Sequence, residues 1–170
     1  MSKLVQSKDY DIRYSYEGDY DFLFDLLSHK EVNKWFPINI ETGAPLFAKN
    51  WIFYAKYLCS LTCLYKKKPC AIGVLFLMPY KKVAHLAMGY MAVHPSMQRK
   101  GIGTSLLKNL QHLGKTKFHL ESIHFEVFEY CPIIPLLKKQ GFAEIIRQER
   151  YVILDKKERA RIVMEKWLDE

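Results

Sequence analysis

The sequence predicts an α/β (α+β) fold in which helices flank a mixed central β-sheet. Its composition, 49% hydrophobic and 26% charged, is typical of a globular chain. Short apolar or alternating segments, as expected for strands, are interleaved with segments whose apolar residues recur every three or four positions, as expected for helices. One apolar strand is followed by a helix and then by another strand, an order that implies a parallel crossover. With its 170 residues the chain is expected to form a single domain, residues 1–170.

The first part of the chain is expected to form a strand and two helices. Residues 11–16 indicate the strand, and the polar residues 17–19 indicate a turn that caps the first helix. Apolar residues at helical spacing in 22–32 predict this helix, and the aromatic residues of 45–57 predict a second one in the same way. The polar residues 39–43 connect the two helices.

A run of strands follows. Residues 58–65 and 71–78 are apolar segments separated by a lysine-rich turn, a pattern that predicts a hairpin. Residues 83–93 are nearly all apolar, as expected of a central strand that is covered on both faces. Gly89 within this strand indicates a bulge or a close backbone approach.

The C-terminal half alternates helices and strands. The elements expected there are a helix at 102–113 stopped by Gly114, a strand at 122–128, a short helix at 132–140 ended by Gly141, and strands at 144–154 and 159–167. The predicted order along the chain is therefore β-α-α-β-β-β-α-β-α-β-β.

The segment around which the other elements are arranged is the loop Gln98-Arg99-Lys100-Gly101-Ile102-Gly103, which opens the third long helix. A helix start leaves backbone N–H groups without intrahelical partners, and the helix dipole favours an anion there. The two glycines remove side chains where a ligand would approach the backbone. A phosphate or pyrophosphate therefore fits this loop. Neither a Walker loop nor a dinucleotide fingerprint has this spacing.

Charge and composition limit the partners. The net charge of +8 favours an acidic partner, which could be coenzyme A, nucleic acid or a ribosomal surface, although a basic face can also serve solubility alone. No nucleic-acid motif is present, so nucleic acid is not expected. Residues 1–11 lack the apolar core of a signal peptide, and the longest apolar run, 71–78, is too short to span a membrane. We therefore expect a cytoplasmic location without membrane contact. The four cysteines lack metal-site spacing, so no metal is expected.

The loop also resembles a known family. Gln98 to Gly103 matches the Gln/Arg-x-x-Gly-x-Gly/Ala loop of the GNAT acyltransferase superfamily, and Ala92-Val93-His94-Pro95, Leu106-Leu107 and Gln140-Gly141-Phe142 are similar to the surrounding family motifs. The element order is also that of the GNAT fold. The resemblance thus covers nearly the whole chain and implies that acetyl-CoA is the co-substrate, with its pyrophosphate at this loop.

The resemblance implies a set of residues for acetyl-CoA. Backbone groups of the central strand would pair with the pantetheine arm like an added strand, and the amides of the loop would hold the phosphates, with Arg99 and Lys100 adding charge. The residues concerned are Met91, Ala92, Val93, Gln98, Arg99, Lys100, Gly101, Ile102, Gly103 and Thr104.

For the general base we expect Glu126. Phe125-Glu126-Val127 resembles the strand of GNAT enzymes that acetylate N-terminal amines of ribosomal proteins, in which a strand glutamate acts through water. A paired structural carboxylate is an equal alternative, and His124, on the same strand face, is expected to be a neighbour rather than a catalyst.

The sequence departs from the family at the leaving group. Four residues before the Gly-Phe motif, where many relatives carry a tyrosine acid, this chain has Leu137, which cannot donate a proton. Tyr130 is the expected substitute, and Cys131 the weaker one. Glutamates that some relatives carry on the central strand are replaced by Ala87, Met88 and Gly89.

The predicted function is acetyl-CoA-dependent transfer of an acetyl group directly to a primary amine. The acceptor could be a small-molecule amine, a polyamine or a peptide N-terminus, and the protein a monomer or a homodimer. Several carboxylates around the first helices could suit a cationic acceptor: Glu17, Asp19, Asp21, Asp25, Glu31 and Glu41. The alternative is a non-catalytic GNAT-like module that senses acyl-CoA or binds RNA or the ribosome.

Overall fold

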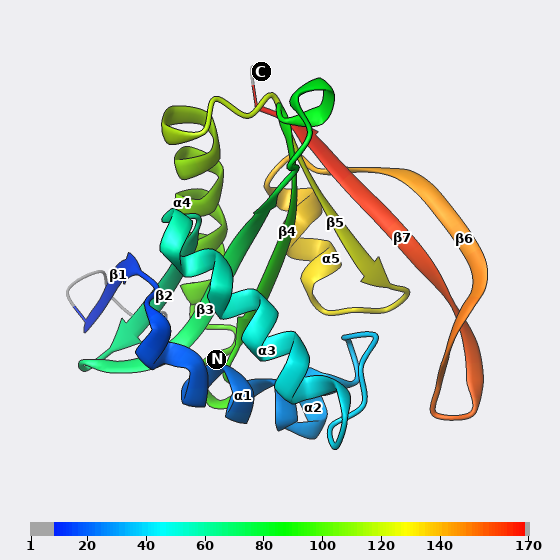
Figure 1. The fold of residues 1–170 in the computed structure, drawn as a ribbon. Coiled ribbons are helices and arrows are strands. Elements are labelled where there is room, and N and C mark those ends of the chain that lie inside the picture. Colours follow the sequence, from blue (N-terminus) through cyan, green and yellow to red (C-terminus); the bar gives the residue numbers. More distant parts are fainter. Residues whose placement is uncertain (1–8, 169–170) are drawn as a thin grey trace.

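The computed structural model describes residues 9–168, which form one mixed sheet flanked by helices (Figure 1). The strands are β1 (Tyr10–Tyr14), β2 (Ser60–Tyr65), β3 (Lys68–Leu77), β4 (Leu86–Val93), β5 (Ser122–Phe128), β6 (Ala143–Leu154) and β7 (Lys157–Trp167). The α-helices are α1 (Tyr20–Ser28), α2 (Lys30–Asn33), α3 (Gly43–Phe53), α4 (Ile102–Lys117) and α5 (Ile133–Lys139). Short 3-10 turns are found at Glu17–Asp19, Tyr54–Tyr57, Lys81–Val83 and Pro95–Met97.

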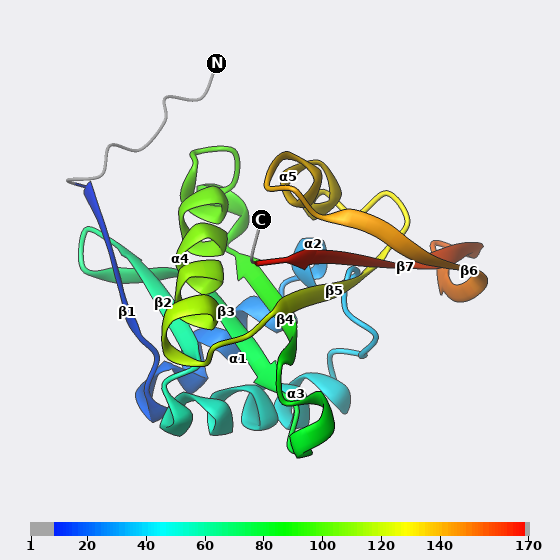
Figure 2. The ribbon, with the colours of Figure 1, turned by 90° about the horizontal axis from the view of Figure 1, so that it is seen from above.

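The seven strands lie in the order β1-β2-β3-β4-β5-β7-β6. Among the described residues, β4 and β5 form the only parallel pair, and α4 provides the crossover between them. The predicted mixed sheet and its element order are confirmed. The β6–β7 hairpin extends beyond the rest of the sheet (Figures 1 and 2).

Helices cover both faces of the sheet (Figure 2). Alternate residues of β3 show the division: Ile72 and Val74 pack in the cluster of α1 and α3 with Trp51, whereas Ala71 and Leu75 pack against α4. Because side chains alternate along a strand, each face of the central strands meets its own apolar layer. Of the helices that are described, none is both long and apolar enough to cross a membrane.

Several predicted boundaries differ from the structure, among them the helix expected at 45–57, which spans Gly43–Phe53, and three others have a clear local cause. The helix expected to stop at Gly114 continues to Lys117, because Gly114 is a packing residue: a Cβ there would lie 3.2 Å from the Ile123 Cδ1 atom. The central strand begins at Leu86 rather than at residue 83, since a 3-10 turn occupies Lys81–Val83. The helical apolar stripe expected to continue loosely from residue 22 to 32 is divided at His29, whose ψ of 123° breaks the helical backbone.

Gly89 makes a close approach of a different kind from the one expected. The β3–β4 register is continuous through Gly89, so the residue forms no bulge. Instead the Phe125 ring of β5 lies against it, and a Cβ at Gly89 would come within 2.4 Å of the Phe125 Cζ atom. The absence of a side chain therefore admits an aromatic ring between β4 and β5.

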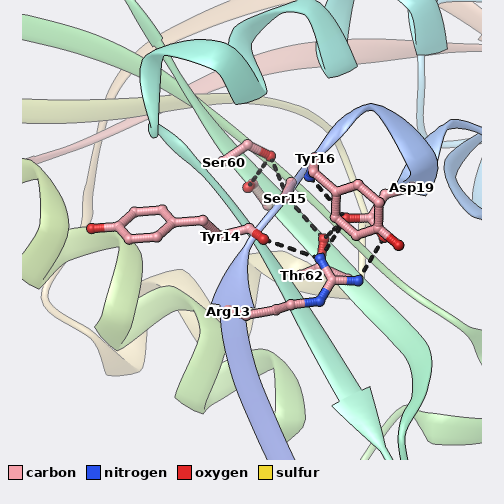
Figure 3. Close-up of polar contacts among 8 residues, drawn as sticks. Arg13, Tyr14, Ser15, Tyr16, Asp19, Ser60 and Thr62 are labelled. Carbon is pink, nitrogen blue, oxygen red and sulfur yellow. Dashed lines mark hydrogen bonds and ion pairs between the residues drawn. The ribbon is translucent and has the colours of Figure 1, made fainter.

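A buried polar network ties the N-terminal strand to the body (Figure 3). Asp19, whose side chain is 2% exposed, accepts hydrogen bonds from Arg13 at 2.7 and 2.8 Å and from the Thr62 hydroxyl at 2.8 Å. Ser15 and Ser60 extend the network to β2 and to the Gly73 carbonyl. A buried carboxylate is tolerated when its oxygens are paired in this way.

Candidate functional site

The central feature of the site is the separation of β4 from β5. Their pairing runs only from Leu86 opposite Ser122 to Met88 opposite His124, although β4 continues to Val93 and β5 to Phe128. The two strands diverge in both views of the ribbon (Figures 1 and 2). The sheet is thus open along the second half of β4.

The backbone of β4 presents hydrogen-bonding groups toward this opening. The His94 N–H donates to the Cys70 carbonyl at 2.9 Å, and the antiparallel pairing with β3 continues without a register shift. Because the bonded pairs of such a ladder alternate, the N–H and C=O groups of Met91 and Val93 point away from β3, toward the side that β5 has left. An extended ligand with its own amides could pair with these groups.

The loop after β4 positions the start of α4 beside the same opening. Gln98 donates from its Nε2 atom to the Val93 carbonyl at 3.1 Å, which fixes the loop to the strand. Arg99 and Gly101 have φ values of 61° and 87°, a left-handed turn in which Gly101 is unstrained. Of the described side chains none caps α4, and its first turn carries no acidic residue. Its N-terminal amides are therefore suited to an anion.

Gly103 lies in the first turn of α4 without a steric need to be glycine. A Cβ there would lie 3.4 Å from the Leu136 Cδ2 atom and 3.7 Å from the Val93 Cγ2 atom, both ordinary contacts. Its effect is to leave the adjacent backbone uncovered. The residues predicted to hold acetyl-CoA, Met91 to Val93 and Gln98 to Thr104, are thus contiguous around one edge of the opening.

Glu126 lies on the β5 face opposite α4 and pairs with an arginine of β7. The Arg161 Nη1 atom donates to the Glu126 Oε2 atom at 2.9 Å, and the two side chains are 27% and 31% exposed. In the part of the chain that the structure describes, the Oε1 atom has no hydrogen-bond partner. Arg161 also donates to Gln148 at 3.0 Å and lies 4.7 Å above the Tyr151 ring. The carboxylate is paired, as the structural alternative expected, and it is also accessible.

Tyr90 is a candidate that sequence reasoning missed. Its pKa is raised to about 12, first by burial and then by the nearby Glu126 carboxylate, with Tyr151 adding to the rise and Arg161 opposing it. The phenol is consequently protonated at neutral pH. Strand alternation was the available signal, since Tyr90 shares the α1–α3 face of the sheet with Ala92.

Two neighbouring groups are held in their neutral forms. Burial lowers the pKa of His124, although Glu126 and Glu165 act in the opposite direction, so the imidazole is neutral near pH 7. Burial raises the pKa of the Cys131 thiol to about 11, with Lys34 opposing the rise. Cys131 therefore lacks the thiolate that a covalent nucleophile requires.

Leu137, at the position where many relatives carry the acid, and its expected substitute Tyr130 lie in different environments. Leu137 is fully buried in the core beneath α5, in the same cluster as Phe142. Tyr130 is 68% exposed in the turn after β5, with φ of 67°, and its ring lies 5.0 Å from the Arg159 guanidinium. The structure thus shows no direct contact between Tyr130 and Glu126 among the residues it describes.

A groove of about 560 Å³ lies between the segment after α2 and strand β6. One side of the groove is formed by the segment after α2, with Lys34, Phe36 and Ile38. The other side includes Tyr151 and Ile153 of β6. The Phe36 ring stacks on Tyr90 with centroids 5.9 Å apart, so this side of the groove contacts the half-buried tyrosine. Within residues 9–168 no group of three or more His, Cys, Asp or Glu side chains is arranged to hold a metal ion.

A mixed sheet opened between parallel neighbours, with an uncapped glycine-bearing helix at the opening, defines a class of acyltransferases. The sequence model of the acetyltransferase (GNAT) family matches residues 21–142, and the chain belongs to this family. The match includes β4, the loop, α4 and β5, whereas β6 and β7 lie beyond it. Members of the family are acetyltransferases, and the predicted enzyme class is confirmed.

Solved structures share the fold at low sequence identity. The YncA protein of Salmonella typhimurium, solved with its cofactor acetyl-CoA, is 18% identical with a TM-score of 0.79, covering 95% of each chain. Ribosomal-protein-alanine N-acetyltransferase from Brucella melitensis is 16% identical with a TM-score of 0.74, over 92% of this chain and 99% of that one. Spermidine N-acetyltransferase from Vibrio cholerae, in complex with CoA and spermine, is 14% identical with a TM-score of 0.79, over 96% and 98%. No curated protein is significantly similar in sequence.

Proposed function

We propose that this protein is an acetyl-CoA-dependent N-acetyltransferase that transfers the acetyl group directly to a primary amine. The observation that carries the proposal is the opening between β4 and β5 beside the uncapped start of α4. One side offers strand-like backbone groups for a chain of amides, and the other offers free helix amides for phosphates. Acetyl-CoA contains both chemistries in one molecule.

The residues that would hold acetyl-CoA follow from this arrangement. Backbone groups of Met91 and Val93 would pair with the pantetheine arm, and the amides from Gly101 to Thr104 would receive the pyrophosphate. Arg99 and Lys100 add positive charge at the rim. When bound, acetyl-CoA supplies an activated thioester, and a β4 N–H would stabilise the negative charge that develops on its carbonyl oxygen.

Glu126 is the proposed general base. A primary ammonium with a pKa near ~10 must lose a proton before its nitrogen can attack. The Oε1 atom of Glu126 is free to accept that proton directly or through water, while Arg161 holds the Oε2 atom at 2.9 Å. The new C–N bond forms as the C–S bond breaks, and the thiolate then takes a proton.

Tyr130 remains the proposed donor of that last proton, and the structure adds Tyr90 as a second phenol to compare. Leu137 cannot donate, and the protonated Cys131 thiol argues against an acyl-enzyme at that residue, which supports direct transfer. A cytoplasmic location fits this reaction, since all four cysteines are free thiols in the structure.

Steady-state release of CoA thiol in the presence of a panel of primary amines tests the proposal, with mass spectrometry of the product. We expect a product heavier by one acetyl group and a thiol yield equal to the product yield. Leu137 at the acid position favours a non-catalytic acyl-CoA sensor as the second candidate. A sensor would bind acetyl-CoA without releasing thiol for any amine, and this outcome would contradict the proposed reaction.

A further inference from the structure

The chemistry of the groove beside Glu126 restricts the acceptor. Resting on the transferase function above, we propose that the acceptor is a primary monoamine carried on an apolar group of about aromatic side-chain size, and that polyamines are selected against. The proposal follows from the groove's lining, from its charge and from the side-chain contacts that connect the lining to Glu126.

The lining of the groove is mainly apolar. Phe36 and Ile38 stand on one side and Phe128 and Ile153 on the other. Its volume of about 560 Å³ lies within the range of ~300–1,000 Å³ found for small-ligand sites. Ile153 is 72% exposed, a large apolar side chain left uncovered at the edge of the groove. An apolar substituent would remove this surface from water.

The lining of the groove is connected to the proposed base by side-chain contacts. Phe128 follows Glu126 by two residues on the same face of β5, and its ring centroid lies 6.3 Å from that of Tyr151. Tyr151 in turn lies under the Arg161 guanidinium at 4.7 Å, and Arg161 binds Glu126. An amine at Glu126 can therefore place its substituent among these rings.

The charge of the groove opposes a polycation. None of the described residues that line it is acidic, and Lys34 contributes a positive charge. Glu126, the proposed base, is already paired with Arg161. The carboxylates that could have suited a polyamine lie elsewhere: Asp19 is buried against Arg13, and Glu17, Asp21, Asp25, Glu31 and Glu41 do not line the groove. A single ammonium can be matched by Glu126, but the further charges of a polyamine cannot.

Binding and turnover test this selectivity separately. Calorimetry on the CoA-saturated protein compares 2-phenylethylamine, a dipeptide amide with N-terminal phenylalanine, and spermidine. We expect at least one of the two apolar amines to bind ~10-fold or more tightly than spermidine, and the one preferred identifies whether the source is a small amine or a peptide N-terminus. Spermidine binding as tightly as the better apolar amine would overturn the inference.

Substitutions on the two sides of the groove give a sharper test. Ile153→Asp should lower the affinity for the preferred apolar amine by ~5-fold or more. Lys34→Glu should raise the affinity for spermidine by ~3-fold or more. The matched controls are Ile145→Asp on the same strand and Lys49→Glu on α3, both outside the groove, and neither should change either affinity. Equal effects of Ile153→Asp and Ile145→Asp would contradict the assignment.

The outcomes separate the two proposals. If acetyl-CoA does not bind, or if thiol is released for no amine, the transferase function fails. If acetyl-CoA binds and spermidine is acetylated at a kcat/KM equal to or above that of both apolar amines, the transferase function stands and only the acceptor inference fails.

Discussion

Arg161 on β7 holds the Glu126 carboxylate of β5 at 2.9 Å, across two strands whose residues are 35 positions apart in the sequence. The guanidinium engages one carboxylate oxygen, and among the described residues the other oxygen has no partner. The geometry thus allows Glu126 to be both fixed in position and able to accept a proton.

Replacing Glu126 by glutamine should lower kcat by about 10²–10³-fold, because the variant cannot take the proton from the acceptor ammonium. The affinity for acetyl-CoA should change less than about twofold, because the proposed donor contacts are backbone groups of β4 and α4. The rate of the variant should rise with pH toward the pKa of the amine, as more acceptor is already deprotonated. Stopped-assay pH profiles of kcat check this.

Glu129→Gln is the matched control for this variant, since Glu129 follows on the same chain segment and pairs with Arg147. Its kcat should be close to that of the wild type. If Glu126→Gln retained full turnover at every pH, Glu126 would be a structural carboxylate and the base would have to be sought elsewhere, with the neutral His124 as the first candidate.

The two tyrosines near the site can be distinguished by removing one hydroxyl at a time. If Tyr130 protonates the leaving thiolate, Tyr130→Phe should lower kcat by ~10-fold or more without changing the Kd of acetyl-CoA. Tyr90→Phe serves as the comparison, because Tyr90 is the half-buried phenol whose pKa the nearby Glu126 carboxylate helps to raise. A loss of kcat in Tyr90→Phe with an unchanged Tyr130→Phe would transfer the acid role to Tyr90.

Two glycines at the opening should respond differently to alanine. Gly89→Ala should destabilise the fold by about 1–3 kcal/mol, because its Cβ would overlap the Phe125 ring. Gly103→Ala should leave the unfolding midpoint unchanged or slightly raised, since the nearest atom to its Cβ lies at 3.4 Å. The Kd of acetyl-CoA should change less than about twofold in Gly103→Ala, because the family loop admits alanine at this position and the Cβ meets only ordinary contacts. Thermal unfolding and calorimetry measure the two effects, and a loss of stability in Gly103→Ala equal to that of Gly89→Ala would contradict the packing assigned to the two glycines.

The Asp19 network predicts a pH-dependent stability. Burial acts to raise the pKa of Asp19, but the hydrogen bonds from Arg13, Thr62 and the Tyr16 N–H together outweigh it and lower the pKa. A carboxyl whose folded pKa lies below its unfolded value of ~3.9 contributes stability above that value. This stability is lost as the pH falls from ~4 through the folded pKa, because the unfolded chain binds the proton more readily.

Asp19→Asn should therefore cost about 2–3 kcal/mol at pH 7, a figure reduced from that of fully buried pairs because Arg13 is 32% exposed. Its unfolding free energy should also depend less on pH between ~5 and ~2 than that of the wild type. Asp25→Asn, an exposed position on α1, is the control and should match the wild type. Denaturant titrations at several pH values give the comparison, and an equal pH dependence in wild type and Asp19→Asn would show that the network does not stabilise the fold through ionisation.

The sequence predicted the parts of the fold that local patterns encode. The loop from Gln98 to Gly103 was predicted because backbone conformation and helix initiation are local, and the β-α-β crossover because strand and helix periods differ. The role of Gly114 was missed, because this glycine allows close packing against Leu120 and Ile123 and does not end the helix.

The candidate site was predictable on its donor side and only in part on its acceptor side. Glu126 was identified by its strand context, but its partner Arg161 follows from the antiparallel β5–β7 pairing, which places Arg161 opposite Phe128. The proximity of Tyr90 to Glu126 depends on how β4 lies beside β5 before the two strands separate, and this arrangement required the structure. The acidic first helices suggested a cationic acceptor, yet the structure brings none of those carboxylates to the groove.

The proposed function requires that the opening between β4 and β5 bind acetyl-CoA through backbone groups and the start of α4. Calorimetric titration of the wild-type protein with acetyl-CoA tests it most directly, repeated at low and high salt. We expect one site per chain with a dissociation constant in the micromolar range, competition by CoA, and weaker binding as salt screens the phosphates. An absence of binding at millimolar acetyl-CoA by a folded protein would contradict it.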